Sequence, residues 1–229
     1  FEGKNVCRHN DITTSNHGSN PPATPPAPSA ETQTFEDAKQ AVANGKCPCC
    51  GAELHPWQKD EHNNAFTPMK EDDFWQKKID QVVDPERKMR FQKTFNEMKK
   101  RKAESRANNK VGKPSCLNVH KDENSGCAMY FDIPKGAKAY SQNPSSSKTP
   151  SQSAKRRFAD SDRSSAVAEW EKYNPGQLPI GVTMHHKTPS MAGGCNNPYN
   201  VVPDTFLSTD TCRKIEKAQK KLEDINDVI

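Results

Sequence analysis

Two adjacent histidines, His185 and His186, lie near the C-terminus of this 229-residue chain, in the segment MHHKTPSMAGGCNNPYNVVP (184–203). One imidazole can hold a divalent cation while its neighbour removes a proton from water, and together they can hydrolyse a phosphodiester. A residue from a second strand must also fix the base, and an amide side chain with a donor and an acceptor suits that role. Asn200 follows His186 by fourteen residues, just before an apolar pair, and is the candidate.

The elements that must position these residues are expected in the order strand, turn, strand, helix. The segment LPIGVTMHH (178–186) is typical of a strand, and the Gly193-Gly194 pair predicts a turn. YNVVP (199–203) predicts a short second strand, and a last helix is expected over 208–227. A hairpin followed by a helix can present a metal ligand and a base at the end of one strand.

The same segment resembles the HNH, or His-Me finger, endonuclease motif. The points of likeness are the paired histidines, Pro189, the Gly-Gly turn, and Asn200 before two valines. The resemblance implies a ββα-metal finger in which His185 binds the catalytic metal and His186 is the general base. It also implies that Asn200 orients the base by bridging the two strands.

The third position of the family lies on the helix, about nine or ten residues beyond the Asn, and is usually His or Asn. Thr209 and Asp210 occupy this window. We expect Asp210 to complete the site, because a carboxylate is a competent ligand for Mg²⁺ or another divalent cation, with Asp204 in reserve. Arginines often assist such sites, and three of them precede the hairpin. They are Arg156, Arg157 and Arg163.

A cysteine cluster lies in the first half of the chain. Cys47-Pro-Cys-Cys50-Gly has the C-x-x-C-G form of a zinc knuckle, in which backbone N–H groups can stabilise the thiolates. One knuckle supplies two ligands, and a closed structural zinc site needs two more. We expect Cys116 and Cys127, with His120 between them, to supply the second pair.

The remaining cysteines leave alternatives open. Cys195 and Cys212 flank the histidine hairpin and are the other candidates for the second pair, while Cys49 can belong to a different pair. Disulfides or reduced core thiols are the alternatives to a metal. A zinc site is nevertheless favoured, because it would stabilise a chain with little apolar core.

The N-terminal segment FEGKNVCRHNDITTSNHG resembles the end of the PAAR-like domains that tip the spike of type VI secretion systems. EGKNVCRH and the later NHG carry this resemblance, which implies metal binding by Cys7, His9 and His17. Residues 1–17 are therefore interpreted as the C-terminal remnant of a PAAR-like domain. A proline-rich linker follows at 18–33.

Residues 34–229 are interpreted as one nuclease toxin domain with three parts. A helical part with the zinc knuckle covers 34–140, a flexible segment covers 141–154, and the HNH-like part covers 155–229. The fold class is expected to be α+β, mostly helical with irregular segments. Helices are predicted over 34–43, 70–82, 85–107 and 155–172, and a strand or hairpin over 128–140.

Composition limits the other function classes. Charged residues make up 28% of the chain, hydrophobic residues 31%, and there are 18 prolines, which favours compact parts joined by extended ones. No apolar run approaches the roughly 20 residues that span a bilayer, so we expect no membrane insertion. The first residues lack an initiator Met and the apolar run of a secretory signal, so we expect a fragment or processed product.

The net charge of +5 is concentrated in a basic segment at 87–113. Either a solvated helix face or a polyanion-binding face explains such a segment, and a nuclease of broad preference would use it for phosphate contacts. The candidate contacts are Arg87, Lys88, Arg90, Lys99, Lys100, Arg101 and Lys102.

Together these patterns predict a metal-dependent, largely non-specific DNA endonuclease. The two resemblances imply an antibacterial effector that a type VI system secretes and that acts in the cytoplasm of the target bacterium. They also imply a cognate immunity protein in the producing cell. An RNase on the same scaffold is one alternative, and a non-catalytic adaptor of the spike that binds zinc and nucleic acid is another.

Overall fold

The computed structural model describes residues 35–113, 116, 129–135, 137, 167–168, 170–172, 175–176, 182–197, 200–204 and 209–229. Helices and two small antiparallel sheets make up this part of the chain, which confirms the predicted α+β class. The predicted segments 1–17, 18–33 and 141–154 lie outside it. So do the candidate residues Cys7, His9, His17, His120, Cys127, Arg156, Arg157 and Arg163.

The helices lie where the sequence predicts them: α1 (Phe35–Ala43), α2 (Glu71–Asp80), α3 (Pro85–Lys110) and α5 (Asp210–Glu223). Asp84 caps α3, because its Oδ1 accepts the backbone N–H of Arg87 at 2.8 Å. Thr209 caps α5 in the same way, accepting the N–H of Cys212 at 3.1 Å. Of the helix predicted over 155–172, residues 167–168 and 170–172 are described and are helical.

Two pairs of short strands complete the fold. β1 (Thr67–Met69) pairs antiparallel with β2 (Tyr130–Asp132), and β3 (Met184–His186) pairs antiparallel with β4 (Val201–Pro203). The sequence does not predict β1, because three residues centred on a proline show no apolar alternation. Short 3₁₀ helices lie at Pro56–Gln58 (η1), Ser190–Ala192 (η5) and Asp224–Asp227 (η7).

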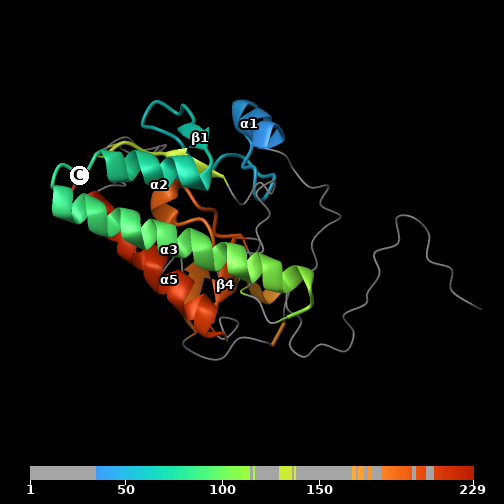
Figure 1. The fold of residues 1–229 in the computed structure, drawn as a ribbon. Coiled ribbons are helices and arrows are strands. Elements are labelled where there is room, and N and C mark those ends of the chain that lie inside the picture. Colours follow the sequence, from blue (N-terminus) through green and yellow to red (C-terminus); the bar gives the residue numbers. More distant parts are fainter. Residues whose placement is uncertain are drawn as a thin grey trace, which may run out of the picture.

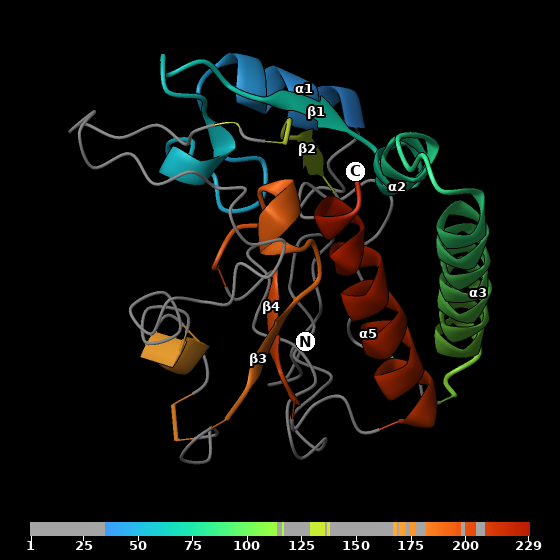
Figure 2. The ribbon, with the colours of Figure 1, turned by 90° about the vertical axis from the view of Figure 1, so that its left-hand side faces the viewer.

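Helix α5 lies between the β3–β4 hairpin and α3 (Figure 1, Figure 2). On the hairpin side, Nε2 of Gln219 donates to the carbonyl oxygen of His186 at 3.0 Å. On the other side α3 packs along α5, and α2 packs against α3. Helix α5 therefore contacts the histidine hairpin on one side and contributes residues to the main core on the other.

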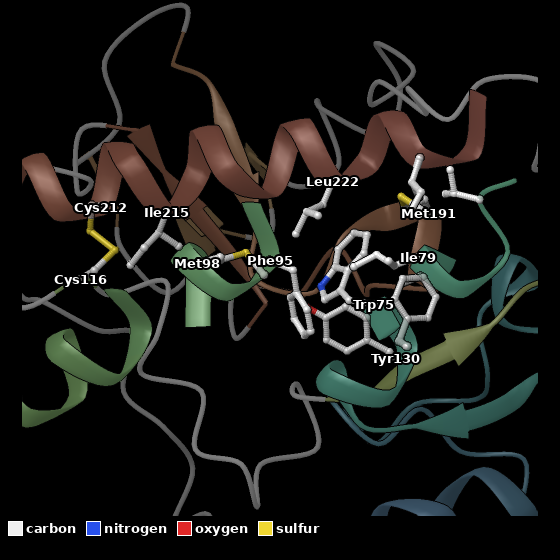
Figure 3. Close-up of a cluster of buried hydrophobic side chains, with 14 of the residues drawn as sticks. Trp75, Ile79, Phe95, Met98, Cys116, Tyr130, Met191, Cys212, Ile215 and Leu222 are labelled. Carbon is white, nitrogen blue, oxygen red and sulfur yellow. A yellow bond between two sulfur atoms is a disulfide. The ribbon is translucent and has the colours of Figure 1, made fainter. Parts of the chain in front are cut away.

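The main apolar core fills the space between α2, α3, β2 and α5 (Figure 3). Trp75 and Tyr130 are fully buried at its centre. Phe91, Phe95 and Met98 of α3 face this core, whereas Met89 is 68% exposed. Met89 precedes Phe91 by two residues, which is about 200° around a helix, so it lies on the opposite face.

A second apolar cluster lies under the N-terminal part of the described chain. It joins Val42 of α1 with Leu54, Phe66 and Phe131. A third, smaller cluster packs Trp170 against the strands of the histidine hairpin. In the part of the chain that is described, no helix combines the length and the apolarity needed to cross a bilayer.

Candidate functional site

Four side chains that can bind a metal converge at the turn of the β3–β4 hairpin. They are Cys47, Cys50, His55 and Cys195, and their ligand atoms all lie within 4.8 Å of one another. We call them the thiol–imidazole cluster. Nε2 of His55 lies 3.5 Å from Sγ of Cys50 and 3.1 Å from Sγ of Cys195. All three cysteines are free thiols.

The first two ligands come from a tight turn that the CPCCG sequence predicts. Lys46 and Glu53 form an antiparallel bridge across its base, and the N–H of Gly51 donates to the carbonyl oxygen of Cys47 at 2.8 Å. Gly51 has a φ of +72°, in the left-handed region that glycine adopts without steric cost. The turn thereby brings Cys47 and Cys50 to the same side.

His55 follows this turn and is held by η1. Its backbone N–H donates to Oε1 of Gln58 at 3.0 Å, and its imidazole stacks on Trp57 with the ring centroids 4.7 Å apart. This candidate ligand is not predicted from the sequence, although it follows Cys50 by only five residues. That short C-x-x-C-x₄-H spacing is the local signal that could have identified it.

The pKa values in the cluster diverge because its members share hydrogen bonds. Hydrogen bonds from the thiols of Cys195 and Cys50 lower the pKa of Cys47, and the bond with Cys47 raises the pKa of Cys195. Burial alone would lower the pKa of His55. Hydrogen bonds and attraction from Cys47 and Cys50 outweigh that effect and raise it to about 9. The cluster therefore already stabilises a thiolate, the form that binds metal.

Three sulfurs and one imidazole nitrogen form a typical ligand set for tetrahedral zinc. With Zn–S distances of about 2.3 Å and Zn–N distances of about 2.0 Å, the ligand atoms of such a site are separated by roughly 3.5–3.8 Å. Atoms that already lie within 4.8 Å of one another need only small side-chain shifts to reach this geometry. The thiol–imidazole cluster could therefore hold a zinc ion.

The expected second ligand pair, Cys116 and Cys127, does not complete this cluster. Cys116 forms a disulfide with Cys212, because the chain after α3 returns to the first turn of α5, with the two Cα atoms 5.0 Å apart. Cys127 lies outside the described residues, and Cys49 is disulfide-bonded. Of the alternative pair, only Cys195 reaches the cluster, and nothing in its spacing to the knuckle predicts this.

The two histidines of β3 face different partners, because neighbours on a strand point to opposite faces. Nδ1 of His185 lies 3.1 Å from Oε2 of Glu216 on α5, and the side chains are only 10% and 9% exposed. Nε2 of His186 lies 3.0 Å from Oδ1 of Asn196. Both partner atoms are oxygens that can only accept, so they face ring N–H groups. The basic nitrogens are then Nε2 of His185 and Nδ1 of His186.

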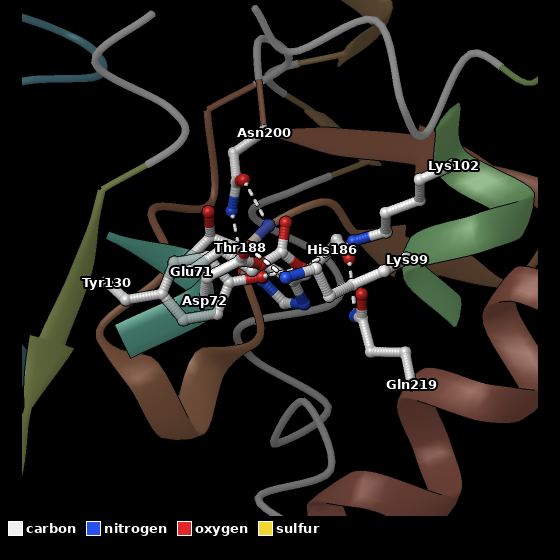
Figure 4. Close-up of polar contacts among 9 residues, drawn as sticks. All are labelled: Glu71, Asp72, Lys99, Lys102, Tyr130, His186, Thr188, Asn200 and Gln219. Carbon is white, nitrogen blue, oxygen red and sulfur yellow. Dashed lines mark hydrogen bonds and ion pairs between the residues drawn. The ribbon is translucent and has the colours of Figure 1, made fainter. Parts of the chain in front are cut away.

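Asn200 bridges the loop that follows the histidines (Figure 4). Its Oδ1 accepts the N–H of Thr188 at 2.8 Å, and its Nδ2 donates to the carbonyl oxygens of Thr188 and Cys195 at 3.0 and 2.9 Å. The side chain is buried, with 1% of the residue exposed. These bonds connect the residue before β4 to the backbone of Thr188 and Cys195 and not to the imidazole of His186, so any effect of Asn200 on that ring is transmitted through the backbone.

The helix carboxylate beside the histidines is Glu216 and not the predicted Asp210. Asp210 is exposed and pairs with Lys214, whose hydrogen bond lowers the pKa of the Asp210 carboxyl. The reserve candidate, Asp204, is also exposed. Glu216 lies on the buried face of α5, one turn beyond Cys212, and an acid at a helix position that faces the core is the signal that position counting missed.

Glu216 also has an unsatisfied oxygen. Its Oε1 is buried and has no hydrogen-bond partner within the described part of the chain. Such an atom is costly to bury, and a cation or a water would remove the cost. The neighbouring Glu223 is affected as well, because burial and the charge of Glu216 raise its pKa to about 7.

The basic residues divide between the core and the surface. Lys102 is buried in an ion pair with Glu71, which also accepts the hydroxyl of Tyr130 at 2.9 Å (Figure 4). Lys99 pairs with Asp72. Lys88 pairs in the same way with Asp80, at 3.5 Å. The surface pairs of Lys88 and Lys99 leave both lysines accessible, so only the buried Lys102 is removed from the predicted phosphate contacts. The predicted contacts that are exposed or half-buried are Arg87, Lys88, Arg90, Lys99, Lys100 and Arg101.

A second basic surface, on α5, is not predicted from the sequence. The solvent face of α5 carries five cations, all exposed, while its opposite face is buried. They are Arg213, Lys214, Lys217, Lys220 and Lys221. Because α3 packs along α5, the exposed cations of the two helices form two adjacent basic stripes.

Comparison with family models, curated proteins and solved structures finds no match for this chain. The function must therefore be argued from the two adjacent sites, the thiol–imidazole cluster and the histidine hairpin.

Proposed function

We propose that this protein is a metal-dependent endonuclease that cleaves DNA with little sequence preference. The observation that carries the proposal is the pair of imidazoles at the end of β3. One is backed by a buried carboxylate, and the other is held by an amide oxygen. Two basic nitrogens with separate supports on adjacent residues suit one metal ligand and one general base.

His185 would hold the catalytic cation through Nε2. Glu216 on Nδ1 fixes this tautomer, as carboxylates commonly do behind metal-binding histidines, and the buried pair fits such a role. A bound Mg²⁺ or similar ion would supply charge neutralisation of the scissile phosphate and of the leaving oxygen. The exposed Asp210 plays no part in this arrangement.

His186 would remove the proton from the attacking water through Nδ1. Asn196 holds the opposite nitrogen, so the ring cannot turn without losing a hydrogen bond. Gln219 of α5 fixes the backbone of the same residue through its carbonyl oxygen. The base is therefore supported from the loop and from the helix.

DNA fits the charge of the surface around the hairpin. Exposed cations on α3 and α5 would contact phosphates and would give binding without sequence preference. In the biological setting that the N-terminal resemblance implies, the chain is a type VI effector with an immunity protein as its partner. We propose a structural zinc ion in the thiol–imidazole cluster, separate from the catalytic ion.

Cleavage of supercoiled plasmid by the full chain tests the proposal. The assay compares the unmodified protein, His186→Ala and the control His62→Ala, in EDTA and with Mg²⁺, Mn²⁺ or Zn²⁺ added. His62 is an exposed histidine in the loop before β1, away from the hairpin. Loss of a general base is expected to lower the rate about 10²–10⁴-fold, and the control should cut at the unmodified rate.

Two outcomes would overturn the proposal. Binding of DNA without cleavage under any metal would favour the adaptor function, since the cluster and the basic stripes do not require the histidines. Equal cleavage by His186→Ala would remove the base from the site. RNA as a parallel substrate separates the RNase alternative.

A further inference from the structure

Residues 193–196, which we call the strap, are held by a different contact at each position. The carbonyl oxygen of Gly193 accepts from Nε2 of Gln58 at 2.9 Å, and that of Gly194 accepts from Nε1 of Trp57 at 3.1 Å. Both donors belong to η1, directly after His55. The first half of the strap is therefore bonded to the segment that carries the cluster.

The second half of the strap leads from the cluster to the histidines. Sγ of Cys195 is a member of the thiol–imidazole cluster, 3.1 Å from the imidazole of His55. The next residue, Asn196, meets Nε2 of His186 through Oδ1 at 3.0 Å. A metal ligand and the support of the candidate base are thus neighbours in sequence, separated by a single peptide bond.

The strap has little room to shift. A Cβ on Gly194 would lie 2.0 Å from the carbonyl oxygen of Thr188 and 2.9 Å from Nδ2 of Asn200. Asn200 in turn bonds the carbonyl oxygen of Cys195. The path from the cluster to His186 therefore runs through closely packed backbone, which transmits small displacements.

The side chain of Cys195 is a free thiol that meets the cluster through non-covalent contacts, such as the 3.1 Å contact of its Sγ with Nε2 of His55. Bonds to a divalent ion would fix the position of Cys195 relative to Cys47, some 150 residues earlier in the chain. We propose that a zinc ion in the thiol–imidazole cluster positions the imidazole of His186 through the strap. Cys195 and Asn196 are then positioning residues, and the ion takes no part in the chemical step.

The consequence for cleavage rests on the proposed nuclease function, whereas the positioning itself does not. Zinc content and amide exchange are therefore the primary readouts. The full chain, loaded with zinc, is compared with the same chain after treatment with a zinc-selective chelator. Zinc is measured by mass spectrometry, and hydrogen exchange is followed in peptides that cover 184–200 and α3.

We expect one zinc ion per chain. On its removal, exchange at 188–197 should become at least about tenfold faster, with α3 unchanged, because only local structure is released. Absence of bound zinc would overturn the inference. So would zinc that binds and leaves with no change in the exchange of the strap.

Asn196→Ala provides a second test that does not disturb the ligands. This variant should keep one zinc ion and its folded helices, yet shift the imidazole NMR signals of His186 in the direction that zinc removal shifts them. Asn196→Asp, which keeps an acceptor oxygen, should restore the signals in part, and Asn96→Ala on the exposed face of α3 should change nothing. Unaltered His186 signals in Asn196→Ala would overturn the inference.

The two proposals fail separately. A chain that cuts no nucleic acid but loses order in the strap with its zinc would refute only the nuclease. A chain that cuts DNA, loses zinc to the chelator and keeps its His186 signals would refute only the positioning role.

Discussion

The helical region and the thiol-held region of this protein are stabilised in different ways. In the helical region, α2, α3 and α5 bury large side chains such as Trp75 and Leu222 against one another. In the thiol-held region, residues 46–58 meet the strap through side-chain hydrogen bonds to its backbone carbonyls and through four potential metal ligands. An apolar core tolerates hydrophobic substitutions of similar size, whereas a metal site requires particular ligand types at fixed distances. Each region can therefore be disrupted without the other.

The largest effect is expected from removing the disulfide of the helical region. Cys116→Ala together with Cys212→Ala opens a link between residues 96 apart, and the chain-entropy model assigns about 4.7 kcal/mol to a loop of roughly that size. Denaturant unfolding of the double variant should show a loss of that order. Zinc content should stay at the unmodified value, because neither cysteine belongs to the cluster. A parallel loss of zinc would show that the two regions are coupled.

A smaller effect is expected from Glu223, the last residue of α5. Its pKa rises from the ordinary 4.5 to about 7 in the folded protein, so the folded state binds the proton more tightly than the unfolded chain. This carboxyl therefore destabilises the fold as pH rises from about 4.5 through 7, by about 3 kcal/mol in total. Unfolding of Glu223→Gln at pH 5 and pH 8 should show a gain confined to the higher pH. An equal gain at both values would contradict this.

The smallest effect is expected at Glu216, and it concerns metal affinity and cleavage activity. Glu216→Gln keeps the shape of the side chain and removes the carboxylate behind His185. Loss of the group that orients a metal-binding histidine costs about 10–100-fold in metal affinity or activity. Metal titration of plasmid cleavage should show this loss for Glu216→Gln, and none for Asp210→Asn, the matched acid on the exposed face. The reverse ranking would return the role to Asp210.

The two regions also differ in how far their structure could be predicted from the sequence. Amphipathic spacing and caps such as Asp84 predict the helices to within a few residues, because local energetics determine them. Cys47 and Cys50 are recognisable as candidate ligands for the same reason, because their C-x-x-C-G spacing is local in the sequence. Cys195 follows from none of these patterns, since only the folded chain brings it to the knuckle.

The differences between the predicted and the observed surroundings of the site have the same origin. Asp210 follows from a position count along a family pattern, but burial on α5 selects Glu216. Lys102 looks like one more cation in a basic run, yet it lies on the stripe of α3 that faces the core and pairs with Glu71. In both cases helical phase decides which residue is buried, and charge type alone does not.

The turn CPCCG has a consequence for how the protein is made. It holds three thiols within four residues, of which Cys47 and Cys50 belong to the cluster and Cys49 is disulfide-bonded. Any of the three could react with an oxidant in a chain that has not yet folded. A zinc ion bound early would mask two of them and leave Cys49 as the reactive thiol. In this sense the metal would serve as a protecting group during oxidative folding, and the order of metal loading and oxidation would determine how much native protein is recovered.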